Sequence, residues 1–157
     1  MPRGARITVT NGCYHIITRG NQRQTVFADP KDYEKYLALL IKYKKKCKCK
    51  LYCFCLMPNH VHLIIETQTP ETLKKFMQGL NLSYTLYFNS KYDKVGHLWQ
   101  DRFKSKLIQK DAYLLECMDY IESNPLRAAL VLKINEYPWN SYLLRTTGSD
   151  TIDNLFL

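Results

Sequence analysis

Apolar residues alternate with polar ones in some stretches of this sequence and recur every three to four residues in others, and these two periods indicate strands and helices. Four alternating or β-branched runs predict strands, at residues 13–18, 50–56, 60–65 and 103–109. Three stretches with helical spacing predict helices that begin after Asp29, at Pro70 and after Asp111. The turn residues Pro58 and Asn59 join the second and third strands into an antiparallel hairpin.

The first two predicted helices each carry one apolar stripe, as expected for helices that pack on a sheet. In the first helix the stripe consists of Tyr33, Tyr36, Leu37, Leu40 and Ile41. In the second it consists of Leu73, Phe76, Met77, Leu80, Tyr84 and Phe88, before a turn-like stretch at 91–96. Lysines gather at the end of the first helix, where they favour the negative end of the helix dipole and also add positive surface.

The third helix is predicted to run from an Asp111 N-cap to Asn124-Pro125. One stripe of this helix is apolar and would hold it against the sheet: Leu114, Met118 and Ile121. The neighbouring stripe carries polar and aromatic side chains: Tyr113, Cys117, Tyr120 and Asn124. Tyr120 and Asn124 are surface neighbours because they are four residues apart, but spacing alone makes Tyr113 nearly as good a candidate for a functional tyrosine.

The predicted order of elements is β-α-β-β-α-β followed by a helix. This order predicts an α+β fold with a ferredoxin-like antiparallel sheet and an added C-terminal helix that carries both tyrosines. The length of 157 residues is typical of one domain. We expect a single domain over residues 1–157, with a core at about 8–128 and a C-terminal extension at 129–157.

The positive net charge of the chain limits the classes of molecule that it is expected to bind. The formal net charge is +9, which favours a polyanion such as nucleic acid, although an anionic membrane surface would also fit. No apolar run approaches the roughly 20 residues of a membrane helix, and the amino-terminal residues lack the apolar core of a signal peptide. We therefore expect a cytoplasmic protein with no membrane partner.

Four cysteines lie close together in the sequence: Cys47, Cys49, Cys53 and Cys55. If the stretch is one extended strand, its first and last cysteines lie roughly 26 Å apart, too far for one metal ion. The stretch also lacks the C-x-x-C turns of zinc sites. We therefore expect these cysteines to act as small apolar residues on one strand face.

His60 and His62 stand one residue apart at the start of an apolar strand, so they share one face of the sheet. Two imidazoles in that arrangement can converge on one metal ion, although a further protein ligand is required. Two ordinary sheet histidines remain the alternative interpretation.

Two further groups of residues are candidates for DNA binding. Arg102, Lys104 and Lys106 fall on one face of the strand predicted at 103–109, and such a basic strip can follow a phosphate backbone. Arg19, Asn21 and Arg23 lie in a polar loop, and their side chains are types that pair with base edges. A half-exposed strand and a solvated loop are the simpler alternatives.

Several of these motifs together resemble the IS200-like tyrosine transposases of the HUH endonuclease group, and most closely the branch of REP-associated tyrosine transposases. The motifs span roughly residues 3 to 142, and they are Tyr14-His15-Ile16, Arg19-Gly20-Asn21, the stretch from Met57 to Ile65, His97-Leu98-Trp99-Gln100-Asp101-Arg102-Phe103, the stretch from Tyr120 to Ala128, and Tyr137-Pro138-Trp139-Asn140-Ser141-Tyr142. No element of the family pattern is missing.

The resemblance implies a reaction and the residues that perform it. Tyr120 would be the nucleophile, with His60, His62 and Asn124 as ligands of Mg²⁺ or Mn²⁺. The substrate would be single-stranded or hairpin DNA, cleaved and rejoined through a 5′-phosphotyrosine intermediate. The family includes monomers and homodimers, and we favour the monomer.

Two other classes of function remain open from the residues themselves. The chain could be a non-catalytic basic nucleic-acid-binding module, which has no use for Tyr120 or a metal. It could also be a metal-dependent hydrolase in which water attacks and no protein–DNA adduct forms. A phenol also needs activation, and His15 and His97 are candidates for a general base that the sequence does not decide between.

Overall fold

The computed structural model describes residues 5–153 and contains one four-stranded sheet. Its strands are β1 (Gly12–Arg19), β2 (Lys50–Met57), β3 (His60–Thr67) and β4 (Lys104–Ile108), in the spatial order β2-β3-β1-β4. All neighbours pair antiparallel, which confirms the predicted ferredoxin-like arrangement. Residues 1–4, part of the stretch interpreted as lacking a signal peptide, and residues 154–157 lie outside the described range.

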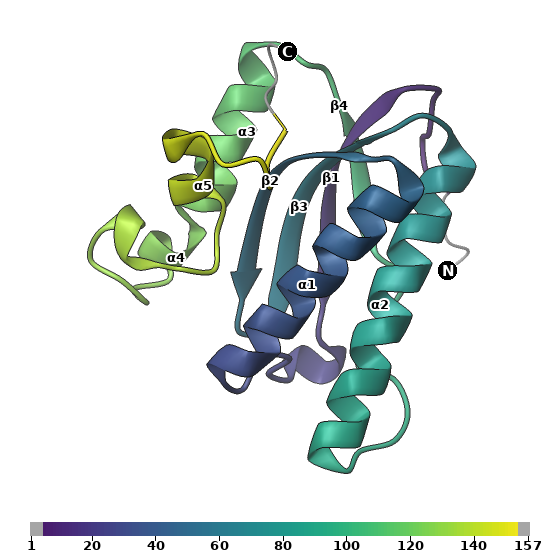
Figure 1. Cartoon of the computed structure of the whole chain (residues 1–157), viewed down its shortest axis with the longest axis vertical. Helices are drawn as coiled ribbons and strands as arrows, with labels where there is room; N and C mark the ends of the chain where they lie inside the picture. The colour runs from purple at the N-terminus through teal and green to yellow at the C-terminus, as the bar shows by residue number, and fades with distance from the viewer. Residues whose placement is uncertain (1–4, 154–157) are drawn as a thin grey trace.

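Two long helices cover one face of the sheet (Figure 1). These are α1 (Pro30–Cys47) and α2 (Pro70–Tyr92), and α2 runs through part of the turn predicted at 91–96. On the other face lies α3 (Ala112–Glu122), with Ser123 as its C-cap. The short α4 (Asn124–Arg127) follows, so the predicted single helix is divided before Asn124. The remaining elements are the short turns η1 (Asn21–Arg23) and η2 (Ile134–Glu136) and the helix α5 (Tyr142–Thr147).

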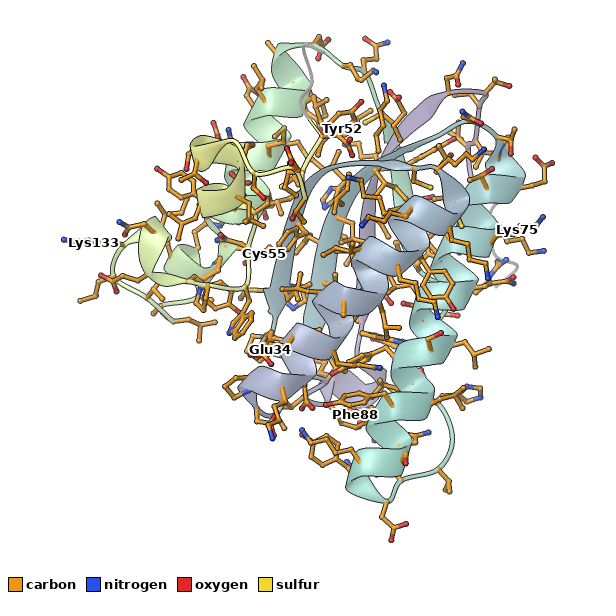
Figure 2. All side chains as sticks on the ribbon, in the orientation of Figure 1. Glu34, Tyr52, Cys55, Lys75, Phe88 and Lys133 are labelled. Atoms are coloured by element: carbon orange, nitrogen blue, oxygen red, sulfur yellow. The ribbon has the colours of Figure 1, made fainter. Side chains whose placement is uncertain are left out.

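The sheet separates two hydrophobic clusters, and strand alternation decides which residue enters which cluster. On β3, Val61, Leu63 and Ile65 pack under α1 and α2, whereas Ile64 belongs to the cluster under α3. The predicted assignment of faces on this strand is therefore confirmed. Figure 2 shows Cys55 of β2 on the side of the C-terminal elements and Phe88 on α2.

The cysteine-rich stretch is not one extended strand, so the prediction that its cysteines share one strand face is wrong. Its lysine-rich part continues α1 through Cys47, and the helix ends at Lys48 in a left-handed conformation. Cys49 packs under the helices, and Cys53 and Cys55 pack on the opposite face. An irregularity in the pairing of β2 between Leu51 and Cys53 changes the alternation there.

The start of α1 is held by a buried carboxylate. Asp29 caps the helix as predicted, and Asp32 completes a capping box with it. The Asp32 carboxylate also accepts hydrogen bonds from Lys91 and Tyr87 at 2.8 Å and from Tyr92 at 2.5 Å. Burial alone would raise the pKa of Asp32, but these donors, Lys91 foremost, lower it to about 2.

We expect Asp32→Asn to lower the free energy of unfolding by about 1 to 2 kcal/mol at pH 7, because an amide cannot accept from all these donors and solvent screens part of the Lys91 interaction. The pKa of Asp32 is depressed in the folded state, so its contribution is present above about pH 4 and is lost as pH falls toward 2. Urea unfolding of both proteins at pH 7 and pH 2.5 measures this, with the exposed Asp150→Asn as control. A difference that persists undiminished at pH 2.5 would contradict the assignment.

The C-terminal segment covers the outer edge of β2. The backbone N–H of Leu56 donates to the Trp139 carbonyl, and that of Ser141 donates to the Phe54 carbonyl. Arg145 of α5 donates to the Glu122 carboxylate, which is fully buried at the end of α3. The segment therefore fixes the end of α3 on the sheet. None of the helices within residues 5–153 is long and apolar enough to cross a bilayer.

Candidate functional site

Three histidines lie on the face of the sheet that α3 covers. His60 and His62 come from β3, and His15 comes from the adjacent strand β1. The Nδ1 atom of His62 lies 3.0 Å from Nε2 of His15, and the ring centroids of His60 and His62 are 5.0 Å apart. His62 is only 6% exposed. The predicted pair therefore lies in a three-histidine cluster, and His15 belongs to the site.

Asn124 joins this cluster from the other side. Its amide nitrogen lies 2.9 Å from Nε2 of His62 and is placed to donate a hydrogen bond to it. Asn124 follows the junction between α3 and α4, so this contact brings the end of the tyrosine-bearing helix onto the histidines. The structure thus brings Asn124 to the histidine pair on β3, from which it is far away in the sequence.

Burial lowers the pKa of all three histidines, which favours their neutral forms. Burial lowers the pKa of His62 to about 3, with His60 and His15 adding to the effect. Burial, with Arg19, lowers the pKa of His60 to about 4, and burial lowers that of His15. Neutral imidazoles keep a lone pair, which is the form that binds metals.

The geometry fits a small divalent ion. Neighbouring ligands about 2.1 Å from an octahedral ion lie about 3 Å apart, close to the 2.9 Å between Nε2 of His62 and the Asn124 amide. Turning that amide about its last torsion angle would present its oxygen, the atom that binds Mg²⁺ or Mn²⁺. No group of three His, Cys, Asp or Glu side chains within residues 5–153 is arranged to hold a metal, so a metal bound by His60 and His62 would need a ligand of another kind, such as the Asn124 amide.

The apolar stripe of α3 packs against the sheet as predicted, and the polar stripe lies along its border. Tyr113 accepts a hydrogen bond from Lys106 of β4 at 3.0 Å, and the Cys117 sulfur lies 3.8 Å from Nδ1 of His15. Tyr120, on the same stripe, is 57% exposed. The helix therefore crosses the sheet from β4 toward β3.

The structure distinguishes the two candidate tyrosines by their neighbours. Tyr120 lies one turn before Asn124, whereas Tyr113 lies roughly 16 Å from Asn124 along a regular helix. The guanidinium of Arg127 lies 3.9 Å from the centre of the Tyr120 ring, and it donates to the Tyr120 carbonyl at 2.7 Å. Sequence reasoning gave Arg127 no role, although it stands in the same motif as Asn124.

The basic strip lies next to the histidines. Lys106 is opposite His15 in the pairing of β1 with β4, and Lys104 is opposite Ile17, so both lysines share the face of the cluster. Arg102 precedes β4 and lies on an exposed bend, so the prediction that it shares a strand with the lysines is wrong. The strand begins two residues after Arg102 and is shorter than predicted.

The predicted polar loop is a short helical turn. Arg19 ends β1 directly opposite His60, while Asn21 and Arg23 lie in η1, where Gln22 and Arg23 have positive φ. The Asn21 backbone N–H donates to the Leu98 carbonyl at 2.7 Å. Arg19 and Arg23 are exposed, and η1 adjoins the histidine end of the sheet. His97 lies on the exposed connection between α2 and β4.

Residues 8–124 match the family model described as "Transposase IS200 like". A curated protein of Haemophilus influenzae, assigned to the REP-associated tyrosine transposases, is 29% identical over 100 residues; the match covers 55% of each chain, so it spans about half the length of this relative. A solved structure of a REP-associated tyrosine transposase bound to a REP hairpin has a TM-score of 0.78 at 16% identity, covering 99% of this chain and 90% of that one. A crystal structure of a protein from Deinococcus radiodurans, assigned as a transposase, has a TM-score of 0.52 at 19% identity, covering 78% and 95%. At these identities the structural matches concern the fold alone.

Proposed function

We propose that this chain, which belongs to the IS200-like transposase family, cleaves and rejoins single-stranded DNA through a 5′-phosphotyrosine intermediate on Tyr120. His60, His62 and Asn124 would hold a divalent metal, Mg²⁺ or Mn²⁺. The structural neighbour is described as bound to a REP hairpin, and we propose hairpin DNA with a single-stranded flank as the partner here.

The contact between Asn124 and His62 is the observation that best supports this proposal. It joins the tyrosine-bearing helix to the predicted metal ligands within one chain. Tyr120 is exposed one turn away, so its hydroxyl is free of the buried core and open to a bound strand. A non-catalytic DNA-binding module would not require this combination of a histidine pair, an amide and an exposed tyrosine.

The reaction proposed for Tyr120 is an in-line displacement at phosphorus. Its phenolic oxygen forms a bond to the phosphorus as the bond to the 3′ oxygen breaks, and the phenol's proton ends on the departing 3′ oxygen. The product is a 5′-phosphotyrosine link and a free 3′-hydroxyl. Attack by a 3′-hydroxyl on this link reverses the step and joins strands without an external energy source.

The chain's own residues contribute orientation and charge. Arg127 stacks on the Tyr120 ring and, by its contact with the Tyr120 carbonyl, holds the end of α3 beside the phenol. Lys104 and Lys106 place positive charge on the same face of the sheet, where a phosphate backbone can lie. A divalent ion, when bound, supplies Lewis-acid stabilisation of charge on the phosphate oxygens.

The lysines and the arginines are expected to play different roles in DNA binding. Lys104→Ala and Lys106→Ala should weaken binding to all single-stranded DNA similarly and reduce the slope of log K against log salt by about 0.7 for each lost phosphate contact. Arg19→Ala or Arg23→Ala should cost about 1 to 3 kcal/mol on the cognate sequence and much less on a scrambled one, if the side chain pairs with a base edge.

A salt titration of each variant on both oligonucleotides measures these effects. Lys75→Ala is a suitable control, because Lys75 lies on α2, which covers the opposite face of the sheet (Figure 2). If the arginine variants lose the same binding free energy on the cognate and the scrambled DNA, Arg19 and Arg23 contribute positive charge and do not read the sequence.

Covalent capture tests the proposed function itself. The protein is incubated with a labelled single-stranded oligonucleotide that carries the hairpin and its flank, with Mg²⁺ or Mn²⁺, and is then denatured. We expect a protein–DNA adduct that depends on the metal and disappears with a chelator. Cleavage without an adduct would indicate attack by water instead.

A further inference from the structure

Each of the two histidines proposed as metal ligands has its Nδ1 atom next to an atom that can accept a hydrogen bond. For His60 this neighbour is the side-chain oxygen of Asn59, at 2.7 Å. For His62 it is Nε2 of His15, at 3.0 Å. A neutral imidazole carries one proton, so the partner of one ring nitrogen decides which nitrogen keeps its lone pair.

The contacts of His62 give its ring a defined direction. Its Nε2 faces the Asn124 amide nitrogen, which can only donate, so Nε2 must be the acceptor. Its Nδ1 must then carry the proton and donate it to Nε2 of His15. His15 in turn holds its own proton on Nδ1, which faces the Cys117 sulfur at 3.8 Å. With the Asn124 amide nitrogen facing His62, the donors along this chain of contacts follow this order.

The contact of His60 leads to the same tautomer by a separate route. An amide oxygen can only accept, so Nδ1 of His60 donates and Nε2 keeps its lone pair. Asn59 is itself fixed in the turn between β2 and β3. Its carbonyl accepts from the Gly20 N–H at 2.8 Å, and the carbonyl of Pro58 accepts from the Val26 N–H at 2.8 Å.

We propose that His15 and Asn59 are positioning residues, which hold His62 and His60 with Nε2 unprotonated and directed toward the metal. The inference rests on the proposed function, because it assigns roles relative to the same metal site. Residues that orient a ligand's second nitrogen typically change metal affinity by about 10- to 100-fold when they are replaced. His15 acts here through His62 and does not itself need to touch the ion.

The first test reads the tautomers in the metal-free protein. Nitrogen-15 spectra of the histidine rings at pH 7, assigned with single-histidine variants, should show Nδ1 protonated and Nε2 unprotonated in His60 and His62. His15→Phe should shift His62 toward a mixture of tautomers and leave His60 unchanged, whereas Asn59→Ala should do the reverse. His15→Gln returns an acceptor oxygen and should restore the His62 signal.

The second test measures Mn²⁺ affinity directly, by calorimetry or by the electron paramagnetic resonance signal of free Mn²⁺. We expect binding about 10- to 100-fold weaker in His15→Phe and Asn59→Ala, with substantial recovery in His15→Gln and Asn59→Asp. The exposed His97→Phe is the matched control and should bind as the wild type does. Thermal unfolding of each variant identifies any loss that comes from misfolding.

The outcomes separate this inference from the proposed function. If the wild type binds Mn²⁺ through His60 and His62, but His15→Phe and Asn59→Ala keep wild-type tautomers and affinity, the inference is wrong and the metal site stands. Equal losses in His15→Gln and His15→Phe would also overturn it. If the wild type and His62→Ala do not differ in Mn²⁺ binding, the metal proposal fails. The tautomer measurement alone then decides whether His15 and Asn59 orient the rings.

Discussion

Replacing Tyr120 by Phe should abolish the covalent protein–DNA adduct and leave binding to the same oligonucleotide almost unchanged. The substitution removes one oxygen, the proposed nucleophile, and keeps the ring on which Arg127 stacks. Loss of a covalent nucleophile typically lowers the rate by a factor on the order of 10⁴ to 10⁶. Denaturing electrophoresis of a labelled oligonucleotide measures the adduct, and fluorescence anisotropy measures binding.

Tyr113→Phe is the matched control, because it makes the same chemical change on the same stripe of α3. It removes the hydroxyl that accepts from Lys106, so a modest loss of DNA binding is expected while adduct formation continues. If Tyr113→Phe instead abolishes the adduct and Tyr120→Phe does not, the assignment of the nucleophile is wrong.

His60→Ala and His62→Ala should each lower metal-dependent cleavage by at least about 100-fold, because each removes one of only two imidazole ligands. Additional Mg²⁺ should restore the activity poorly. Cleavage rates across a metal titration measure this, with Lys75→Ala, on the helix that covers the opposite face of the sheet, as the control.

Full activity in either variant would show that the replaced histidine is not a metal ligand. If a chelator does not lower the activity of the wild type, neither histidine acts through a metal. Since His62 is buried, its variant also needs a thermal unfolding measurement, so that loss of fold is not mistaken for loss of a ligand.

The order of the core elements could be predicted from the sequence, because each has a strong local signal. The apolar positions predicted for α2 are the buried ones, and Asp29 caps α1 as its position before a proline suggested. The cysteine-rich stretch was predicted wrongly, because the alternation of its cysteines begins before strand β2 does. The lysines that precede the strand belong to α1, which continues through Cys47. The helix α5 is short and is held by contacts with β2 and Glu122, which a local pattern does not show.

The candidate site also has a part that the sequence could predict and a part that it could not. Period alone placed His60 with His62 and Tyr120 with Asn124, since both pairs depend only on the geometry of one element. The contact of Asn124 with His62 and that of His15 with His62 depend on how α3 and β1 pack against β3, which the sequence pattern does not specify. Spacing alone left the choice between Tyr113 and Tyr120 open, because both lie on one stripe of the same helix.

Mapping of the covalent adduct tests the central claim most directly. The wild-type protein is trapped on cognate single-stranded DNA with Mn²⁺, digested with nuclease and trypsin, and its modified peptide is sequenced by mass spectrometry. Tyr113 and Tyr120 both lie in the tryptic peptide 111–127, so fragmentation of this one peptide decides between them. The account predicts a nucleotide joined through its 5′ phosphate to Tyr120. Metal-dependent cleavage with no modified tyrosine, or with the nucleotide on Tyr113, would contradict it.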